Sequence, residues 1–376
     1  MTLSETLAQR RIVLCVGSGG VGKTTTSAAL ALEAARRGRR TVVLTVDPAQ
    51  RLKDALGLGT LDGKPRRVAT GTPGVHLDAM LLDVKRTFDE LVLGLASSPE
   101  QAARVLENRL YQNLSNTLAG TAEYMAVETV FKLAQDGGYD LLIVDTPPAR
   151  HAVDFLDAPR RLLALLDSRA FAILKDPTSI LPAAGSRLAS LLLQGVLHGL
   201  ERFTGLGLVR EIGDFVRAIE GLMDGLRARV SAVAALLRSP DTALLLVTAP
   251  EPRLTSETEE LALGLAEIEL GIDGVIVNRA LPRGVFGPDA PAPPPLPGVP
   301  PALLRRLERS YADLNRFAAR QQATLAPLLA TAKAPLLAEV PFLPTAPGTL
   351  AELATLARHL VPESAEPPAP ARGLGR

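Results

Sequence analysis

Short apolar runs recur along the chain, and longer amphipathic stretches separate them. The runs are rich in Val, Ile and Leu and span residues 11–16, 41–46, 75–82, 139–144, 242–247, 273–277 and 335–340. Near-continuous apolar runs of this length are typical of strands that are buried on both faces, with the intervening helices as covers. The pattern predicts an α/β fold: a mostly parallel sheet of the P-loop NTPase type with helices on both faces.

Two segments interrupt this alternation. Residues 160–240 show only helical periodicity, which predicts a helical insertion. Residues 281–301 are so rich in proline that an exposed loop is expected, and a helix over residues 302–332 follows it. The expected organisation is a core formed by residues 1–159 and 241–360, the insertion at 160–240, and a disordered tail over 361–376.

The sequence GSGGVGKTTT at residues 17–26 lies between the first apolar run and an amphipathic stretch. It matches G-x-x-x-x-G-K-[ST], and between a strand and a helix this pattern predicts a loop whose backbone N–H groups surround phosphate oxygens. We expect Lys23 to reach the β- and γ-phosphates and Thr24 to offer its hydroxyl to Mg²⁺. The candidate nucleotide-binding residues here are Gly17, Ser18, Gly19, Gly20, Val21, Gly22, Lys23 and Thr24.

Two aspartates follow other predicted strands. Asp145 ends the run at 139–144, where a carboxylate can hold Mg²⁺ directly or through water, or can cap a helix. Asp47 follows the run at 41–46, where it can orient an attacking water or cap the next helix. Because right-handed crossovers bring the loops after parallel strands to one edge of the sheet, both carboxylates are expected near the phosphate loop.

Composition narrows the classes of partner. The 376 residues carry a formal net charge of +1, which gives no electrostatic indication of nucleic acid or an anionic membrane. The one cysteine, Cys15, is expected as a buried strand residue and leaves no C-x-x-C zinc site. The N-terminal residues have no apolar core typical of a signal peptide, so a cytoplasmic protein is expected.

Several of these motifs together resemble the ArsA-type ATPases. The matching segments are GSGGVGKTT, VDPA at 46–49, DTPPARH at 145–151, VNRALP at 277–282, and Glu251, Glu257 and Thr258 in the segment from residue 248. The likeness extends over about residues 11–358 and is greatest to an actinobacterial-type subgroup, marked by GTAEYMAVE and FLDAPRRL. The family includes the ATPase of the arsenite pump and a relative that targets tail-anchored membrane proteins.

The resemblance implies roles for single residues. Thr25 would contact the α-phosphate, Asp47 would position or activate the attacking water, and Asp145 would serve Mg²⁺ through water. Asn278 would hydrogen-bond the adenine ring, and Pro341 would lie where the last loop packs on the base. The implied protein is a dimeric ATPase that uses ATP and Mg²⁺ and couples hydrolysis to a protein or membrane-associated client.

The chain departs from the family pattern at three places. The arsenite-binding cysteines have no counterpart, the C-x-x-C pair that joins subunits through zinc is absent, and Ser18 replaces the signature lysine that crosses the dimer interface. Three explanations stay open. Either the loop works without that lysine, or an arginine such as Arg51 or Arg150 replaces it, or a related lysine-bearing subunit completes the site. A homodimer and a heterodimer with a lysine-bearing paralogue therefore stay open, and the heterodimer is slightly favoured.

Two other functional classes stay open. A partition-type ATPase acts on DNA or membrane, and the near-neutral charge of this chain disfavours DNA. A P-loop small-molecule kinase has the same phosphate-binding loop, but it also needs an arginine-bearing lid and a second substrate pocket. A measurement of whether the phosphate of ATP appears free or on an acceptor distinguishes a hydrolase from a kinase.

Overall fold

The chain divides into two compact units. A computed structural model describes residues 1–47, 51–108, 111–112, 121–168, 218–282, 285–287, 290, 296–343 and 347–362. The first unit consists of Met1–Leu82, Leu133–Val153 and Pro240–Arg376, and the second of Asp83–Lys132 and Asp154–Ser239. Residues 169–217 of the expected insertion, and 363–376 of the expected tail, lie outside the described residues.

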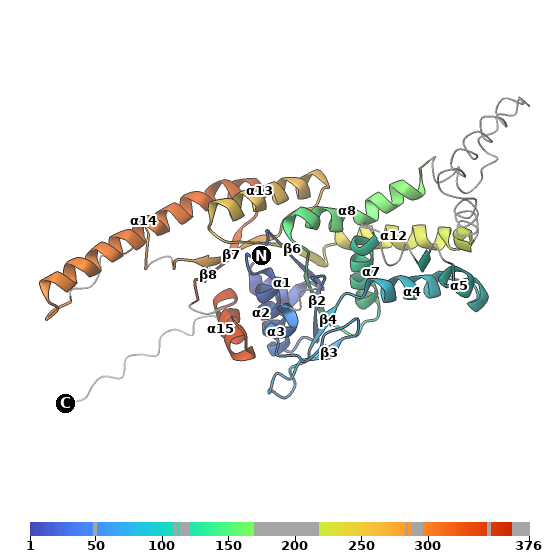
Figure 1. The fold of residues 1–376 in the computed structure, drawn as a ribbon, viewed down its shortest axis with the longest axis horizontal. Coiled ribbons are helices and arrows are strands. Elements are labelled where there is room, and N and C mark those ends of the chain that lie inside the picture. The colour runs from blue at the N-terminus through green and yellow to red at the C-terminus, as the bar shows by residue number, and fades with distance from the viewer. Residues whose placement is uncertain are drawn as a thin grey trace, which may run out of the picture. The chain divides into compact units, whose positions relative to one another are not determined.

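The described part of the first unit contains one eight-stranded sheet (Figure 1). In order across the sheet its strands are β3 (Arg66–Arg67), β4 (Leu77–Leu81), β2 (Thr41–Thr45), β5 (Leu141–Asp145), β1 (Ile12–Val16), β6 (Thr242–Thr248), β7 (Gly274–Ala280) and β8 (Leu336–Pro341). All neighbours are parallel except β3 and β4. The predicted α/β fold is confirmed, and each of the seven apolar runs forms a strand.

Burial explains why these runs form strands. Every residue of β1, β2, β5 and β6 is buried, so these strands lie in the middle of the sheet with both faces covered. The buried thiol of Cys15 in β1, whose pKa burial raises to about 12, confirms the strand assignment of that residue. The two exposed arginines of β3 have no apolar pattern, which is why this short antiparallel strand was not predicted.

Helices cover both faces of the sheet. One face is covered by α2 (Lys23–Arg36) and by the helices that pack on it: α1 (Leu3–Gln9), α3 (Arg51–Ala55) and α15 (Leu350–Leu360). Those on the other face are α13 (Pro252–Glu267), which packs on β6, and α14 (Pro301–Ala332), which packs on α13 and β7. The predicted helix over 302–332 is thereby confirmed.

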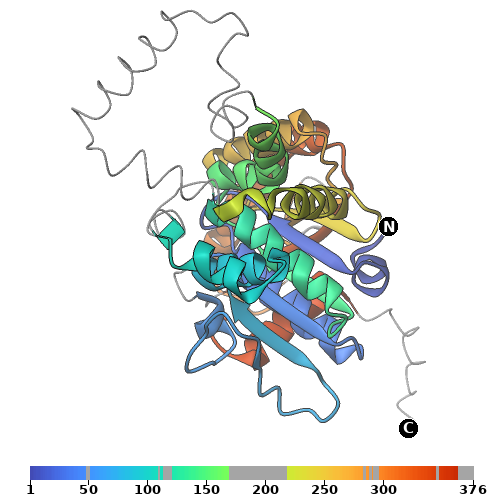
Figure 2. The same cartoon turned by 90° about the vertical axis from the view of Figure 1, so that its right-hand side faces the viewer.

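The second unit is helical in its described residues. It contains α4 (Val84–Leu95), α5 (Pro99–Leu106), α12 (Met223–Leu237), most of α7 (Thr121–Gln135) and the later part of α8 (Ala149–Leu166). Figure 2 faces these helices, and the ion pair of Glu128 with Arg229 joins α7 to α12. Val92, Val105, Tyr111 and Leu222 form a separate core cluster. Asp83–Lys132, which we expected with the core of residues 1–159, falls in this unit, and Val92, Val105 and Tyr111 of that range pack in the cluster.

No described helix is both long enough and apolar enough to cross a membrane.

Candidate functional site

The strands β1, β2 and β5 end side by side at one edge of the sheet. The strand register pairs Cys15 with Asp145, and Thr45 with Asp145. The glycine-rich loop follows β1 directly and leads into α2. Parallel pairing therefore brings the loop, Asp145 and the residues after β2 to the same place, as the sequence predicted.

Close contacts with β6 and β7 restrict the conformation of the glycine-rich loop. A Cβ on Gly17 would overlap the carbonyl oxygen of Val247 in β6, and one on Gly22 would overlap the side-chain amide of Asn278. Gly22, the N-cap of α2, also has a left-handed backbone with φ of 95°. Only glycine fits these two positions, so the loop conformation depends on β6 and β7 as well as on its own sequence.

The ammonium of Lys23 lies folded into the loop. It donates to the carbonyl oxygens of Gly17 and Ser18, each at 2.9 Å, and the residue is 7% exposed. Burial lowers the pKa of this ammonium, while the carboxylates of Asp145 and Asp47 act in the opposite direction. A buried cation with carbonyl partners is ready to exchange them for anionic oxygens, because much of its desolvation has already occurred on folding.

Asp145 is the most deeply buried acid of the site, with 1% exposure. Its Oδ2 accepts hydrogen bonds from Thr24 Oγ1 at 2.7 Å and from Thr45 Oγ1 at 2.9 Å. Its Oδ1 is buried and has no hydrogen-bond partner. Burial raises the pKa of this carboxyl to about 6, against the effect of the two hydroxyls and of Lys23. Thr45 was missed in the sequence, although a threonine at the end of a buried strand beside Asp145 was a usable signal.

These oxygens fit a magnesium ion. Mg²⁺ prefers oxygen ligands, keeps several waters and needs one or two protein groups. The hydroxyl of Thr24 and the unpartnered Oδ1 of Asp145 are such groups. The described residues contain no cluster of three or more His, Cys, Asp or Glu that could hold a metal, so the fit is to an ion bound partly by other ligands, such as phosphate oxygens and water.

Asp47 lies two residues after β2 and is half-buried. Its backbone N–H donates to Thr45 Oγ1 at 3.2 Å, which ties it to the threonine that also binds Asp145. Its carboxylate raises the pKa of Lys23, so the two side chains lie within electrostatic reach of each other. The residues that follow, 48–50, lie outside the described residues.

The side chain of Ser18 is fully buried and bonds within its own chain. Its hydroxyl donates to the carbonyl oxygen of Leu254 at 3.2 Å and lies 3.1 Å from the hydroxyl of Thr258, both in α13. The Thr258 hydroxyl in turn donates to Leu254, and it accepts from Thr248 at the end of β6. Residue 18 therefore fastens the loop to α13.

Asn278 is brought to the loop, and Pro341 lies one strand further out. The Asn278 amide donates to the carbonyl oxygen of Val21 at 2.8 Å, and its Oδ1 accepts from the backbone of Arg279 at 3.0 Å. Pro341 ends β8 beside Ala280. The remaining predicted loop residues lie as expected at the start of α2 or before it: Gly19, Gly20, Val21 and Thr25.

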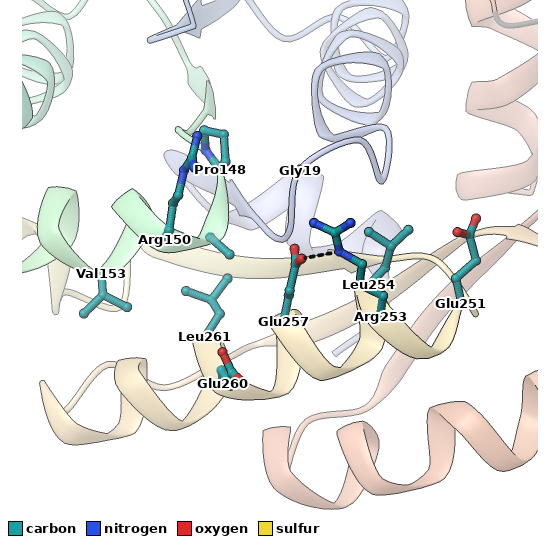
Figure 3. Close-up of a pocket in the computed structure, with 11 residues that line it drawn as sticks. Gly19, Pro148, Arg150, Val153, Glu251, Arg253, Leu254, Glu257, Glu260 and Leu261 are labelled. Atoms are coloured by element: carbon teal, nitrogen blue, oxygen red, sulfur yellow. Dashed lines mark hydrogen bonds and ion pairs between the residues drawn. The ribbon is translucent and has the colours of Figure 1, made fainter.

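A cavity of about 840 Å³ opens beside the loop (Figure 3). Gly19, the segment from Pro148 to Val153 and one face of α13 line it. Glu257 points from α13 toward the loop that carries Gly19 and pairs with Arg253 at 3.0 Å. The cavity is lined on this side by the N-cap residue of α13, Glu251, and by Arg253, Leu254, Glu257, Glu260 and Leu261 of the helix. Both signs of charge therefore border the open side of the loop.

The overlap at Gly17 predicts a loss of stability on substitution. Gly17→Ala pushes its Cβ into the Val247 carbonyl oxygen, and overpacking of this kind typically costs about 1–3 kcal/mol. Gly19→Ala is the matched control, since nothing lies within 4 Å of its Cβ. Thermal unfolding without nucleotide should show a lower Tm for Gly17→Ala alone. Equal melting of the two variants would show that the close approach to β6 is relaxed in solution.

Burial of Asp145 predicts a pH dependence of stability. Its pKa of about 6 lies above the ordinary value of 3.8, so its contribution to stability is present below pH 3.8 and is lost as pH rises through 6. Above that pH the buried charge costs up to about 3 kcal/mol. Asp145→Asn should therefore gain stability relative to wild type between pH 4 and 7, measured by denaturant unfolding without Mg²⁺ or nucleotide.

Asp140→Asn provides the control of opposite sign. Asp140 is paired with Arg40, which lowers the pKa of its carboxyl to about 2, so its contribution is present above the unfolded pKa and is lost as pH falls. The stability of this variant relative to wild type should not increase as pH rises. A difference between Asp145→Asn and wild type that stays constant from pH 4 to 7 would contradict the assignment of a raised pKa.

Comparison with known proteins identifies the family. A family model described as anion-transporting ATPase matches residues 10–286. ATPase GET3 of Phaeosphaeria nodorum is 29% identical over 286 residues, which cover 74% of this chain and 80% of that protein. ATPase get3 of Schizosaccharomyces japonicus is 28% identical over 295 residues, covering 78% and 81%. With its phosphate-binding loop, buried lysine and strand-end aspartate, the chain belongs to the anion-transporting (ArsA-type) ATPase family and is an ATP-hydrolysing enzyme.

Proposed function

We propose that the chain is a Mg²⁺-dependent, dimeric, cytoplasmic ATPase switch that couples ATP binding and hydrolysis to binding of a protein or membrane-associated client. The observation that carries this proposal is the unpartnered, buried Oδ1 of Asp145 beside the hydroxyl of Thr24. A buried carboxylate oxygen without a partner is costly unless a cation completes it. In a nucleotide-binding loop that cation is Mg²⁺ bound with the phosphates.

Several groups of this chain act on the nucleotide in this proposal. Backbone N–H groups from Gly19 to Thr25 bind phosphate oxygens, helped by the N-terminal dipole of α2. Lys23 leaves the carbonyl oxygens of Gly17 and Ser18 and binds the β- and γ-phosphates. Because the ammonium of Lys23 is already buried, most of the cost of removing it from water is met on folding. A bound magnesium ion would neutralise part of the phosphate charge.

Asp47 positions the attacking water. Its place after β2, its half-buried carboxylate and its electrostatic reach to Lys23 support this role. The hydrogen bond of its backbone to Thr45 links it to Asp145, the proposed magnesium ligand, because the Thr45 hydroxyl also donates to Asp145. A carboxylate so placed orients one water and accepts its proton as the oxygen attacks the γ-phosphate.

Asn278 and Pro341 bind the base in this proposal. The Asn278 amide lies against Gly22 and donates to Val21, so it is already at the loop. A side-chain amide can donate and accept together, which matches the N6–N7 edge of adenine. Such pairing with the base requires the amide to turn away from Val21 when ATP binds.

The second subunit is either a copy of this chain or a lysine-bearing paralogue. The hydroxyl of Ser18 is used within its own chain, which supports a dimer in which this position sends nothing to the partner's nucleotide. Arg150, which lines the cavity, and the exposed Arg51 follow the two strand ends and are the arginines of this chain proposed to replace the missing lysine. The client is assigned to the helical insertion at residues 160–240, of which α12 is a described part, and a membrane protein is one kind of client.

Replacement of Asp47 tests the proposed hydrolysis. Asp47→Asn should keep ATP affinity nearly unchanged and slow hydrolysis by about 10²-fold or more, the usual scale for losing a positioned base. Lys23→Ala is the contrasting variant and should weaken ATP binding at least about tenfold, because a charge-assisted contact is lost. Binding by calorimetry and single-turnover release of phosphate measure the two effects. Equal losses of binding and turnover in Asp47→Asn would make Asp47 a structural or magnesium-associated residue.

Replacement of Asn278 tests the proposed base site. Asn278→Ala should weaken ATP more than GTP, since the amide matches adenine. The variant also loses the hydrogen bond to Val21, and that loss should weaken both nucleotides equally. Competition binding of ATP and GTP to wild type and variant therefore separates the two roles. An unchanged ATP-to-GTP ratio would restrict Asn278 to holding the loop.

A further inference from the structure

Three residues other than glycine have a left-handed backbone in the described part of the chain. They are Glu269, Arg279 and Lys333, with φ of 62°, 60° and 49°. Glu269 directly follows the C-cap of α13, and Lys333 is the C-cap of α14, positions where such a backbone commonly ends a helix. Arg279 lies instead inside β7. This region is unfavourable for a residue with a Cβ, so neighbouring contacts must hold Arg279 in it.

A bulge in β7 contains Arg279. The strand register pairs Val277 with Glu339 and Ala280 with Pro341, so three steps along β7 oppose two steps along β8. The extra residue therefore belongs to positions 278–279. Bulges of this kind disrupt the ladder locally and change the direction of a side chain, and they are frequent beside binding sites.

The chain beyond the bulge is fastened to two neighbours. The N–H of Phe342, which follows β8, donates to the carbonyl oxygen of Ala280 at 3.0 Å. The N–H of Leu281 donates to the buried side chain of Gln321 in α14 at 2.9 Å. Because the backbone is held at both of these residues, tertiary contacts impose the left-handed conformation just before them.

The N–H of Arg279 meets the side chain of Asn278. It donates to Asn278 Oδ1 at 3.0 Å, while Asn278 Nδ2 donates to the carbonyl oxygen of Val21 at 2.8 Å. An amide turned end for end would place its oxygen against the Val21 carbonyl and its NH₂ group against the Arg279 N–H. Both of those contacts would be repulsive, so the two neighbours select one orientation of the amide.

The side chain of Arg279 takes no part in this arrangement. Arg279 is exposed, and its guanidinium forms no hydrogen bond or ion pair with any residue that the structure describes. Glycine at this position would keep the N–H and would adopt the left-handed backbone without strain. Isoleucine, which is branched at Cβ, would oppose that backbone.

A fixed amide oxygen affects which base fits. Adenine presents a donor at N6 and an acceptor at N7 along one edge, whereas guanine presents acceptors at both O6 and N7. In the proposed function the Asn278 amide turns away from Val21 when ATP binds, and the Arg279 N–H is then the contact that keeps Oδ1 in place. The second lone pair of Oδ1 can accept from N6 of adenine and repels O6 of guanine. Without this contact the amide could turn its NH₂ group to O6.

We propose that Arg279 is a positioning residue that gives the base site its preference for adenine. Its left-handed backbone places an N–H on Asn278 Oδ1, and the amide held in this way accepts a hydrogen bond from position 6 of the base. The proposal rests on the proposed function, since it takes Asn278 to bind the base. It adds the group that decides which purine the site accepts.

Substitution of Arg279 in the full chain tests the proposal. Competition binding compares ATP with inosine triphosphate, whose base carries an oxygen at position 6 and has no amino group at position 2. Arg279→Ile should lower the ratio of ATP affinity to inosine triphosphate affinity about three- to tenfold, the scale of one hydrogen bond. Arg279→Gly should keep the wild-type ratio, because it retains both the N–H and the backbone conformation.

Lys333→Ile is the matched control. Lys333 has the same left-handed backbone and is exposed, but it lies at the end of α14 and donates nothing to Asn278. Lys333→Ile should lower the Tm, as Arg279→Ile does, and leave the affinity ratio unchanged. Circular dichroism verifies the fold of each variant. Arg279→Thr, which is branched at Cβ and polar, takes the place of Arg279→Ile if that variant does not fold.

Asn278→Ala separates this proposal from the proposed function. It should lower the affinity ratio at least as much as Arg279→Ile, and combining the two should lower it no further, because Arg279 acts through Asn278. A ratio lowered by Asn278→Ala and unchanged by Arg279→Ile would overturn the role of Arg279 and keep the base site. A ratio unchanged in both variants would overturn the base site and the role of Arg279 together. A ratio lowered by Arg279→Gly would also contradict the proposal, since the guanidinium would then act on the base.

Discussion

The rest of the site depends on a buried carboxylate with only one of its oxygens paired. Asp145 ends the central strand β5, and the hydroxyls of Thr24 and Thr45 reach the same oxygen, Oδ2. A second oxygen left without a partner at this depth is unfavourable. Burial also raises the pKa of the carboxyl. The folded protein therefore buries a carboxylate oxygen at an energetic cost, and binding of a cation would offset that cost. This is the physical reason for locating the chemistry at this strand end.

The glycine-rich loop is held by its neighbours as much as by its own sequence. β6 approaches so closely that only glycine fits at position 17, and Asn278 of β7 fills the space beside Gly22. The Ser18 hydroxyl fastens the loop to α13, while the Ser18 carbonyl accepts from Lys23. One residue thus links the buried lysine to the helix that lines the cavity. A long cationic side chain at this position could not make the same short contacts with Leu254 and Thr258.

The sequence was sufficient to predict the features that depend on local patterns. Near-continuous apolar runs predicted the seven parallel strands, and the loop motif after β1 with Asp145 at the end of β5 predicted which groups meet at one edge of the sheet. Tertiary contacts decided what was missed. The hydroxyl of Thr45 matters because parallel register sets it beside Asp145, and Ser18 bonds to α13 although more than 230 residues separate them. Asp83–Lys132 joins the second unit through packing around Tyr111, which helical periodicity does not specify.

The Mg²⁺ dependence of ATP binding tests the central claim most directly. Calorimetric titration of ATP into the full chain, with Mg²⁺ and with a chelator, isolates the contribution of the ion. We expect tighter binding with Mg²⁺ in wild type, and we expect that gain to disappear in Asp145→Asn, whose amide cannot neutralise the ion, while Mg²⁺-free affinity stays within a few-fold of wild type. ATP affinity that is equal with and without Mg²⁺ in wild type, or a Mg²⁺ gain that survives in Asp145→Asn, would contradict the assignment of this carboxylate.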